Sequence, residues 1–178
     1  MTHVALLRGV NVGGKHVLPM ALLAELFAAA GASEVRTFIQ SGNVVFRATA
    51  AAAIANKVAA AIDKKLGFRP PIAVRSAAQL AKMIAANPFV RAGAPTDQRH
   101  VAFLLARPSA RAIATLEPAR FAPDAFAVVG DHVYLHYPNG VARTKLSNAY
   151  LDARLATTST TRNWNTVRAL HELAAGGR

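Results

Sequence analysis

The first half of the chain alternates short apolar stretches with segments of helical periodicity. Residues 3–7 are apolar and end at Arg8-Gly9, which predicts a strand. Leu22, Leu23, Leu26 and Phe27 then recur at helical spacing until Gly31. Continued through residue 75, the pattern predicts the following elements: strand 3–7, helix 19–30, strand 35–40, a turn at Ser41-Gly42, strand 43–47, helix 54–66 and strand 71–75. This β-α-β-β-α-β order is that of a ferredoxin-like fold.

The second half shows a related order of elements. The pattern predicts helix 77–86, a link at 87–98, strand 100–105, helix 109–116, paired strands 126–129 and 132–136, and helices near 146–155 and 165–174. The fold class is therefore α+β with two subdomains: a ferredoxin-like one over 1–86 with a split β-α-β arrangement, and a related β-α-β-β unit with C-terminal helices over 99–178. We see no sequence repeat between the halves, so their relation is one of topology.

Composition narrows the class of protein. The chain has 178 residues, 53% of them apolar, and no Cys. This composition excludes a disordered chain, a disulfide framework, a thiolate zinc site, an iron–sulfur cluster and a cysteine nucleophile. The N-terminus has no basic region, and Arg8 ends its apolar run, which argues against a signal peptide. We expect a soluble cytoplasmic protein that has no membrane segment.

The charge balance favours an anionic ligand. With 21 Lys plus Arg and 9 Asp plus Glu, the net charge is +12. The cations are spread along the chain with no run of five, which favours a diffuse basic surface over a dedicated nucleic-acid patch.

A glycine-rich loop follows the first predicted strand. Residues 9–15 have the form G-x-x-x-x-G-K, but His16 stands where a phosphate-binding loop needs Ser or Thr for Mg²⁺. This difference argues against a P-loop NTPase. Two interpretations stay open. The backbone N–H groups of Gly13 and Gly14 bind an anion beside Lys15, or the glycines only provide a β–α turn.

Two polar turns are expected to converge in the first subdomain. In a split β-α-β unit the first and third strands are antiparallel neighbours, so the end of one lies beside the start of the other. This places Arg8 and Asn11 near Gln40, Ser41 and Asn43. We predict a binding site at this edge of the sheet.

The segment before the last predicted helix is the other unusual stretch. Trp164 is the only Trp, and it lies between Asn163 and Asn165. Thr161 or Asn163 could cap the helix, and a helix N-terminus beside Arg162 is a ready anion site. In the alternative interpretation, Trp164 anchors the helix and the Asn residues cap it.

These segments carry a family resemblance. Leu6-Leu-Arg-Gly-Val-Asn-Val-Gly-Gly-Lys15, Ile39-Gln-Ser-Gly-Asn-Val44 and Arg162-Asn-Trp-Asn-Thr-Val167 resemble the signatures of the bacterial domain of unknown function 1697 family. The resemblance extends to Tyr134–Pro138 and Lys145-Leu146, and implies an α+β pair of subdomains, the first ferredoxin-like. It implies no activity. Where the family often has Gly-Arg-Ser-Lys-Leu, this chain has Ala142-Arg-Thr-Lys-Leu146, which keeps a hydroxyl and the cation Lys145.

Other chemistries find little support. His132 and His136 lie four residues apart on a predicted strand, about 13 Å from one another, so they cannot share a metal. We expect no metal and no cofactor.

The hypothesis that these patterns favour is a module that binds an anionic, phosphate-bearing ligand, a nucleotide or a nucleic acid, at the junction of the subdomains. An enzyme acting on a small phosphorylated or carboxylated substrate, with Lys15 and Arg162 as electrostatic clamps, is one alternative. A homo-oligomeric interaction protein is another. The reaction and the oligomeric state stay open.

Overall fold

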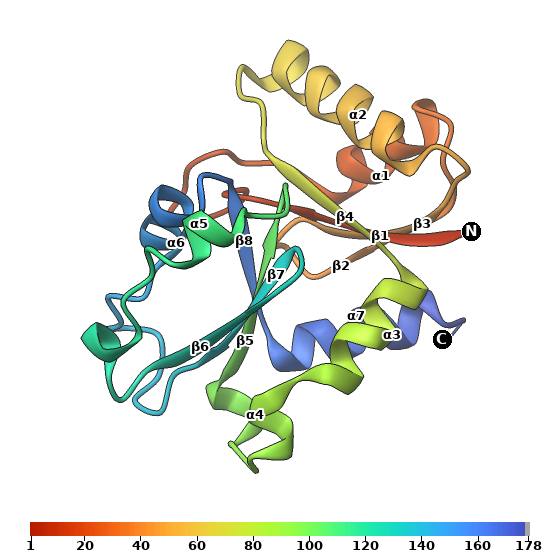
Figure 1. The fold of residues 1–178 in the computed structure, drawn as a ribbon. Helices are drawn as coiled ribbons and strands as arrows, with labels where there is room; N and C mark the ends of the chain where they lie inside the picture. Colours follow the sequence, from red (N-terminus) through yellow and green to blue (C-terminus); the bar gives the residue numbers. More distant parts are fainter. Residues whose placement is uncertain (177–178) are drawn as a thin grey trace. The chain divides into compact units, whose positions relative to one another are not determined.

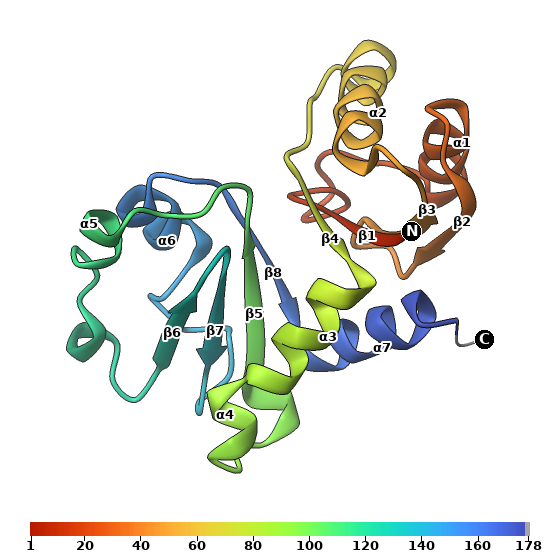
Figure 2. The same cartoon turned by 45° about the vertical axis from the view of Figure 1, so that its right-hand side comes forward.

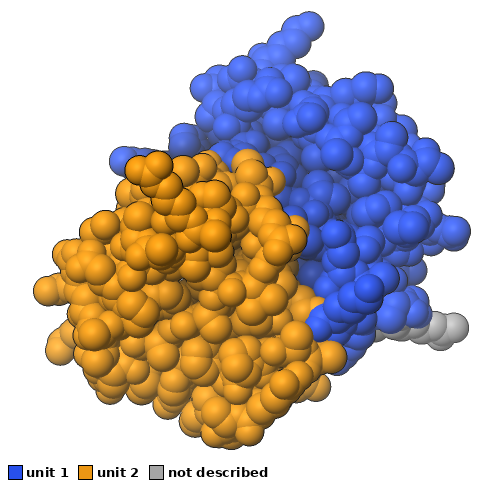
Figure 3. Space-filling view, in the orientation of Figure 1, with its two compact units in different colours: residues 1–82, 169–178 blue, residues 83–168 orange. Residues whose placement is uncertain are grey.

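The computed structural model describes residues 1–176 and divides into two compact units. One comprises residues 1–82 together with the end of the chain from Ala169, and the other comprises Met83–Arg168 (Figure 3). The predicted subdomain boundaries, 1–86 and 99–178 with a link at 87–98, stay a prediction. Within residues 1–176, none of the helices combines the length and apolar character needed to cross a membrane.

The first unit is the predicted ferredoxin-like subdomain. Its elements are β1 (Thr2–Leu7), α1 (Met20–Ala29), β2 (Ser33–Phe38), β3 (Asn43–Arg47), α2 (Ala51–Leu66) and β4 (Ile72–Ser76), followed by α3 (Ala77–Ala86), whose residues from Met83 onward belong to the second unit (Figure 1). The sheet order is β2-β3-β1-β4, and all neighbours are antiparallel. The α+β class and the ferredoxin-like order are confirmed.

Helices α1 and α2 cover one face of this sheet (Figures 1 and 2). Phe27 of α1 and Val58 and Ile62 of α2 are fully buried there, and Phe27 packs on Phe46 of β3 with ring centroids 5.0 Å apart. Gly67 ends α2 in the left-handed conformation, as a C-terminal glycine should. Burial of these apolar side chains provides the main stabilisation of the unit.

The second unit repeats this topology completely. Its elements are α4 (Pro88–Arg91), the 3₁₀ turn η1 (Thr96–Gln98), β5 (Arg99–Leu104), α5 (Ala110–Ile113), the 3₁₀ turn η2 (Pro118–Phe121), β6 (Ala125–Val129), β7 (His132–His136), α6 (Asn148–Leu155) and β8 (Ser159–Asn163), followed by α7 (Trp164–Ala174), whose residues from Ala169 onward belong to the first unit. The sheet order β6-β7-β5-β8 matches that of the first unit strand for strand.

Strand β8 is not among the elements predicted from the sequence. Its sequence, Ser-Thr-Thr-Arg-Asn, has no apolar residue and so lacks the alternation that identifies a half-buried strand. Helix α6 satisfies its polar groups instead. The Ser159 hydroxyl donates to Asp152 at 2.6 Å, and the Thr161 hydroxyl donates to Asn148 at 2.5 Å.

The predicted helix over 109–116 is shorter in the structure. Ser109 caps α5 by accepting a hydrogen bond from the Ala112 N–H at 3.1 Å. The helix ends at Ile113, and the Thr115 hydroxyl donates to the Ala112 carbonyl at 2.7 Å. That local side-chain bond competes with helix continuation.

The strand registers show a sequence repeat that we do not see in the chain alone. His3 pairs with Ser76 in the first sheet, and His100 pairs with Asn163 in the second. This register aligns residues 3–7, His-Val-Ala-Leu-Leu, with residues 100–104, His-Val-Ala-Phe-Leu. The relation between the halves therefore includes sequence as well as topology.

The equivalence extends to the last strand of each repeat. Arg75 of β4 and Arg162 of β8 pair with Val4 and Val101, and each arginine donates to the carbonyl of its preceding residue, at 2.8 and 2.9 Å. The next residue then caps a helix in both cases. Ser76 accepts from the Gln79 N–H at 3.2 Å, and Asn163 accepts from the Thr166 N–H at 2.8 Å.

The repeats differ in their connections. The first has a long segment between β1 and α1, residues 8–19, against 105–109 in the second. The second has long segments before β6 and after β7, residues 114–124 and 137–147, against 30–32 and 48–50 in the first. The glycine loop lies in the added segment of the first repeat, and Lys145 lies in one of those of the second.

Candidate functional site

The glycine loop folds as a tight turn on the surface of the first unit. Val12 and Lys15 form an isolated antiparallel bridge, with the Lys15 N–H donating to the Val12 carbonyl at 3.1 Å. Gly13 and Gly14 between them have φ of 58° and 72°, which requires glycine-like freedom at both central positions. The exposed Lys15 ammonium forms no ion pair with residues 1–176.

Asn11 connects this loop to the turn between β2 and β3. Its side-chain amide donates to the carbonyls of Leu18 and Gln40, at 2.9 and 2.8 Å, and its Oδ1 accepts from the Leu18 N–H at 2.8 Å. The predicted convergence of the two turns is therefore confirmed. Because all three bonds are internal, Asn11 holds the loop in place.

The turn over residues 39–42 is closely packed against β1. Asn43 is fully buried, and its amide donates to the Phe38 carbonyl at 3.1 Å and the Ser41 hydroxyl at 2.8 Å. Gly42 has φ of 72°, and a Cβ there would lie 2.5 Å from Val10 Cγ2 and 2.9 Å from Leu7 Cβ. Glycine is thus required at this position for both conformation and space.

The polar residues at the rim of these turns differ in their surroundings. The backbone N–H of Arg8 donates to the Pro71 carbonyl at 2.9 Å, and the Arg8 side chain is partly buried. Gln40 is exposed, and its side-chain amide forms no hydrogen bond with residues 1–176. Ligand binding by Arg8, Asn11, Gly13, Gly14, Lys15, Gln40, Ser41 and Asn43 stays a prediction.

The Arg162–Asn165 stretch joins β8 to α7, with Arg162 and Trp164 buried and the two Asn side chains exposed. The Arg162 guanidinium donates to the Thr160 hydroxyl at 2.8 Å and to the Thr161 carbonyl at 2.9 Å. Burial lowers the pKa of Arg162 to about 10, so the side chain stays charged at neutral pH. Trp164 is 3% exposed, and the guanidinium of Arg99 lies 5.5 Å from its ring centroid.

Of the two predicted caps for α7, Asn163 provides the hydrogen bond, whereas the Thr161 hydroxyl binds Asn148. Asn165 is exposed. These contacts favour the interpretation in which Trp164 anchors the helix and Asn163 caps it. Ligand binding by Arg162, Asn163, Trp164 and Asn165 stays a prediction.

A cavity of about 580 Å³ lies in the second unit. Its lining comes from the two added segments: Arg120, Phe121, Ala122, Pro123, Asp124, Asn139, Gly140, Ala142, Arg143, Thr144 and Lys145. Lys145 is a candidate from the sequence, whereas Arg120, Asp124 and Arg143 are not. Only the cluster of Arg143, Thr144 and Lys145 after a Pro-Asn-Gly turn could have indicated this site.

A chain of hydrogen bonds fixes the cavity's second segment. The Thr144 hydroxyl donates to Asp124 Oδ2 at 2.5 Å and accepts from the Leu146 N–H at 3.0 Å. The buried Tyr137 hydroxyl donates to the Leu146 carbonyl at 2.9 Å. Burial and the nearby Asp124 carboxylate both raise the pKa of Tyr137, so it stays a hydrogen-bond donor.

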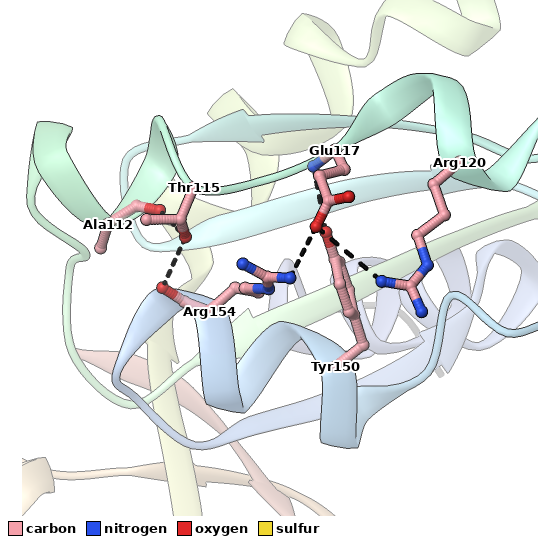
Figure 4. A network of polar contacts seen from close by, with 6 residues as sticks. All are labelled: Ala112, Thr115, Glu117, Arg120, Tyr150 and Arg154. Carbon is pink, nitrogen blue, oxygen red and sulfur yellow. Dashed lines mark hydrogen bonds and ion pairs between the residues drawn. The ribbon is translucent and has the colours of Figure 1, made fainter.

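The first segment is tied to α6 by the network in Figure 4. The Glu117 carboxylate binds Arg154 at 2.6 Å and lies 3.8 Å from Arg120, while the Glu117 N–H donates to the Tyr150 hydroxyl at 3.0 Å. The Thr115 hydroxyl lies 3.3 Å from the Arg154 carbonyl. Because Arg154 holds Glu117 closely, Arg120 is only weakly neutralised.

The cavity lining carries a net positive charge. Arg120, Arg143 and Lys145 stand against one carboxylate, Asp124. Arg143 and Lys145 are exposed, and their side chains form neither an ion pair nor a hydrogen bond with the described part of the chain, residues 1–176. The cavity therefore offers unpaired cationic donors of the kind that bind anionic oxygens.

No group of three or more His, Asp and Glu among residues 1–176 is placed to hold a metal ion.

A family model described as a protein of unknown function, DUF1697, matches residues 1–134. The chain belongs to the DUF1697 family. The matched range includes the glycine loop, the turn over 39–42 and the first cavity segment of this DUF1697 protein. The second cavity segment and residues 162–167 lie beyond it, so the match says nothing about them.

One solved structure with the same fold is described as the conserved bacterial protein SP0830 from Streptococcus pneumoniae. The TM-score is 0.69 and the sequence identity is 17%, over 97% of this chain and 98% of that chain. At this identity the likeness concerns the fold alone, and it confirms the α+β architecture. A comparison with curated proteins finds no match.

Proposed function

We propose that this DUF1697 protein binds a small phosphate-bearing anion in the cavity of its second unit. The observation that carries the proposal is the lining of the cavity, where Arg120, Arg143 and Lys145 face a single carboxylate. Two of these cations have no partner among residues 1–176, so binding an anion would break no internal ion pair of theirs.

The physical chemistry favours phosphate. Arginine presents a planar fork of N–H donors that matches phosphate oxygens, and lysine adds a point charge. The cavity volume of about 580 Å³ falls within the range of roughly 300–1,000 Å³ that is typical of small-molecule sites. The ligand is therefore expected to be larger than inorganic phosphate.

A small ligand is favoured over a nucleic acid. Proteins with this kind of sheet bind RNA by stacking bases on exposed aromatic side chains of the central strands. The central strands β5 and β7 carry Phe103 and Tyr134, which are 1% and 0% exposed. The Tyr134 hydroxyl donates to the Met83 carbonyl at 2.7 Å, and burial raises its pKa to about 12. These rings are not available for stacking.

The test is calorimetric titration of the purified protein with tripolyphosphate. We compare the wild type with the double variant Arg143→Ala/Lys145→Ala and with Lys64→Ala/Lys65→Ala, which removes the same charge from the end of α2. Charge-assisted contacts are worth about 1.5–3 kcal/mol each, so the cavity variant should bind at least about tenfold more weakly. The control should bind like the wild type.

Two results would overturn the proposal. An equal loss in both double variants would mean that overall charge attracts the anion. Tight binding of single-stranded RNA with a steep salt dependence, unchanged in the cavity variant, would favour a nucleic-acid interface elsewhere.

A further inference from the structure

Asp124 is the one acidic side chain in the lining of the cationic cavity, and no cation among residues 1–176 pairs with it. Thr144 donates to its Oδ2 at 2.5 Å. Its Oδ1 accepts no hydrogen bond from residues 1–176, and Asp124 forms no salt bridge with the arginines or the lysine of the same lining. An ionised carboxylate offers several acceptor positions, of which Thr144 occupies one.

This carboxylate is unfavourable for bare phosphate. Like charges in a partly enclosed site repel, so the affinity for phosphate alone would be higher without Asp124. Asp124 contributes to binding only when the ligand brings a hydrogen-bond donor to Oδ1, because an ionised carboxylate cannot donate.

We infer that the cavity recognises a sugar phosphate, with a sugar hydroxyl donating to Asp124 Oδ1 while Arg143 and Lys145 bind the phosphate. This inference rests on the proposed function and names the ligand class of the same site. A neutral hydroxyl suits the position better than an ammonium group, which the three cations of the lining would repel. Carboxylates serve the same purpose in dinucleotide sites, where Asp or Glu binds a ribose hydroxyl.

The remaining lining is consistent with a ligand that has a sugar or a larger group beyond its phosphate. Phe121, Ala122, Pro123 and Ala142 provide apolar surface, and Asn139 carries an amide with both donors and an acceptor. The apolar residues and the cations therefore give the cavity two chemically different parts.

The experiment compares two phosphate monoesters of equal charge, ribose 5-phosphate and methyl phosphate, by calorimetry. Wild-type protein should bind ribose 5-phosphate about tenfold more tightly, as expected for a hydrogen bond to a charged acceptor. Asp124→Ala should abolish this preference while methyl phosphate binds at least as tightly as before, because the repelling charge is gone.

Thr144→Val is the matched control. It removes the hydroxyl that holds Asp124 but keeps the carboxylate, so any loosening of the loop should change both affinities by a similar factor and leave their ratio above about fivefold.

The outcomes separate the two proposals. If wild-type protein binds both esters equally, the sugar inference is wrong, while the proposed phosphate site stands. If it binds neither ester and no tripolyphosphate, the proposed function itself fails. If Asp124→Ala weakens both esters by the same factor as Thr144→Val, Asp124 only positions the loop and the inference is overturned.

Discussion

The two repeats form equivalent sheets but carry their long connections at opposite ends of them. In the first unit the long connections lie at the end of β1 marked by Leu7, where residues 8–19 and 39–42 meet. In the second they lie at the start of β5 marked by Arg99, where residues 114–124 and 137–147 meet. One architecture thus provides two separate positions for additional structure.

The additions also differ in how their polar groups are used. In the first unit Asn11 and Asn43 use their amides for internal hydrogen bonds, and Gly42 has no room for a side chain. In the second unit Arg143 and Lys145 form no such bonds with residues 1–176 and line a cavity. Asn11 and Asn43 therefore stabilise the packed turns of the first unit, whereas Arg143 and Lys145 leave their donors open to a ligand.

Gly42→Ala should have the largest effect on stability, because it tests the close packing of the turn in the first unit. The new Cβ would meet Val10 and Leu7 at 2.5 and 2.9 Å, and φ is 72°, so overpacking and backbone strain add to a loss of about 3–4 kcal/mol. In the turn of the second repeat Gly130, at φ 61°, has nothing within 4 Å, and Gly130→Ala should cost about 1 kcal/mol. Chemical denaturation measures both. Equal losses would contradict the close packing of the first turn.

The helix caps sharpen the comparison because they are equivalent in the two repeats. Asn163→Ala and Ser76→Ala each remove the side-chain acceptor that caps a helix, so each should lower the free energy of unfolding by about 1 kcal/mol. Asn165→Ala, at an exposed neighbouring position, should change it by less than about 0.5 kcal/mol. A large effect in one repeat alone would show that the caps are not equivalent.

The smallest expected effect concerns the repeated histidines. Burial lowers the pKa of both His3 and His100 below 6.5 in the folded protein. Both are neutral above pH 6.5, and as the pH falls the unfolded chain takes up protons first, so stability declines from pH 6.5 toward the folded pKa values. His100→Gln should flatten this decline, by under ~1 kcal/mol between pH 7 and 5. An unchanged slope in denaturation curves would assign the pH dependence to other groups.

Much of the first unit could be predicted because its signals are local. Apolar alternation identifies its strands, and the antiparallel neighbours β1 and β3 bring Asn11 to Gln40. Strand β8 escapes such a prediction because all five of its residues are polar and its partners lie on α6.

The repeat and the cavity depend on long-range register. The equivalence of residues 3–7 and 100–104 becomes visible only when the paired strands are aligned. Arg120 and Lys145 come from separate connections with no periodic pattern, so no local signal places them in one lining. Sequence reasoning therefore finds the tightly bonded turns more readily than the open site.

The polar character of β8 has a consequence for folding. Strand β5 forms the centre of its sheet only after β8 has docked, and β8 lies far along the chain from β5. Until then β5 presents an unpaired edge of apolar residues, the kind of template on which chains aggregate. A Ser-Thr-Thr-Arg-Asn strand has too little hydrophobicity to join such aggregates while it is still undocked. The strand that completes the second sheet therefore stays soluble in the unfolded chain until it docks on β5.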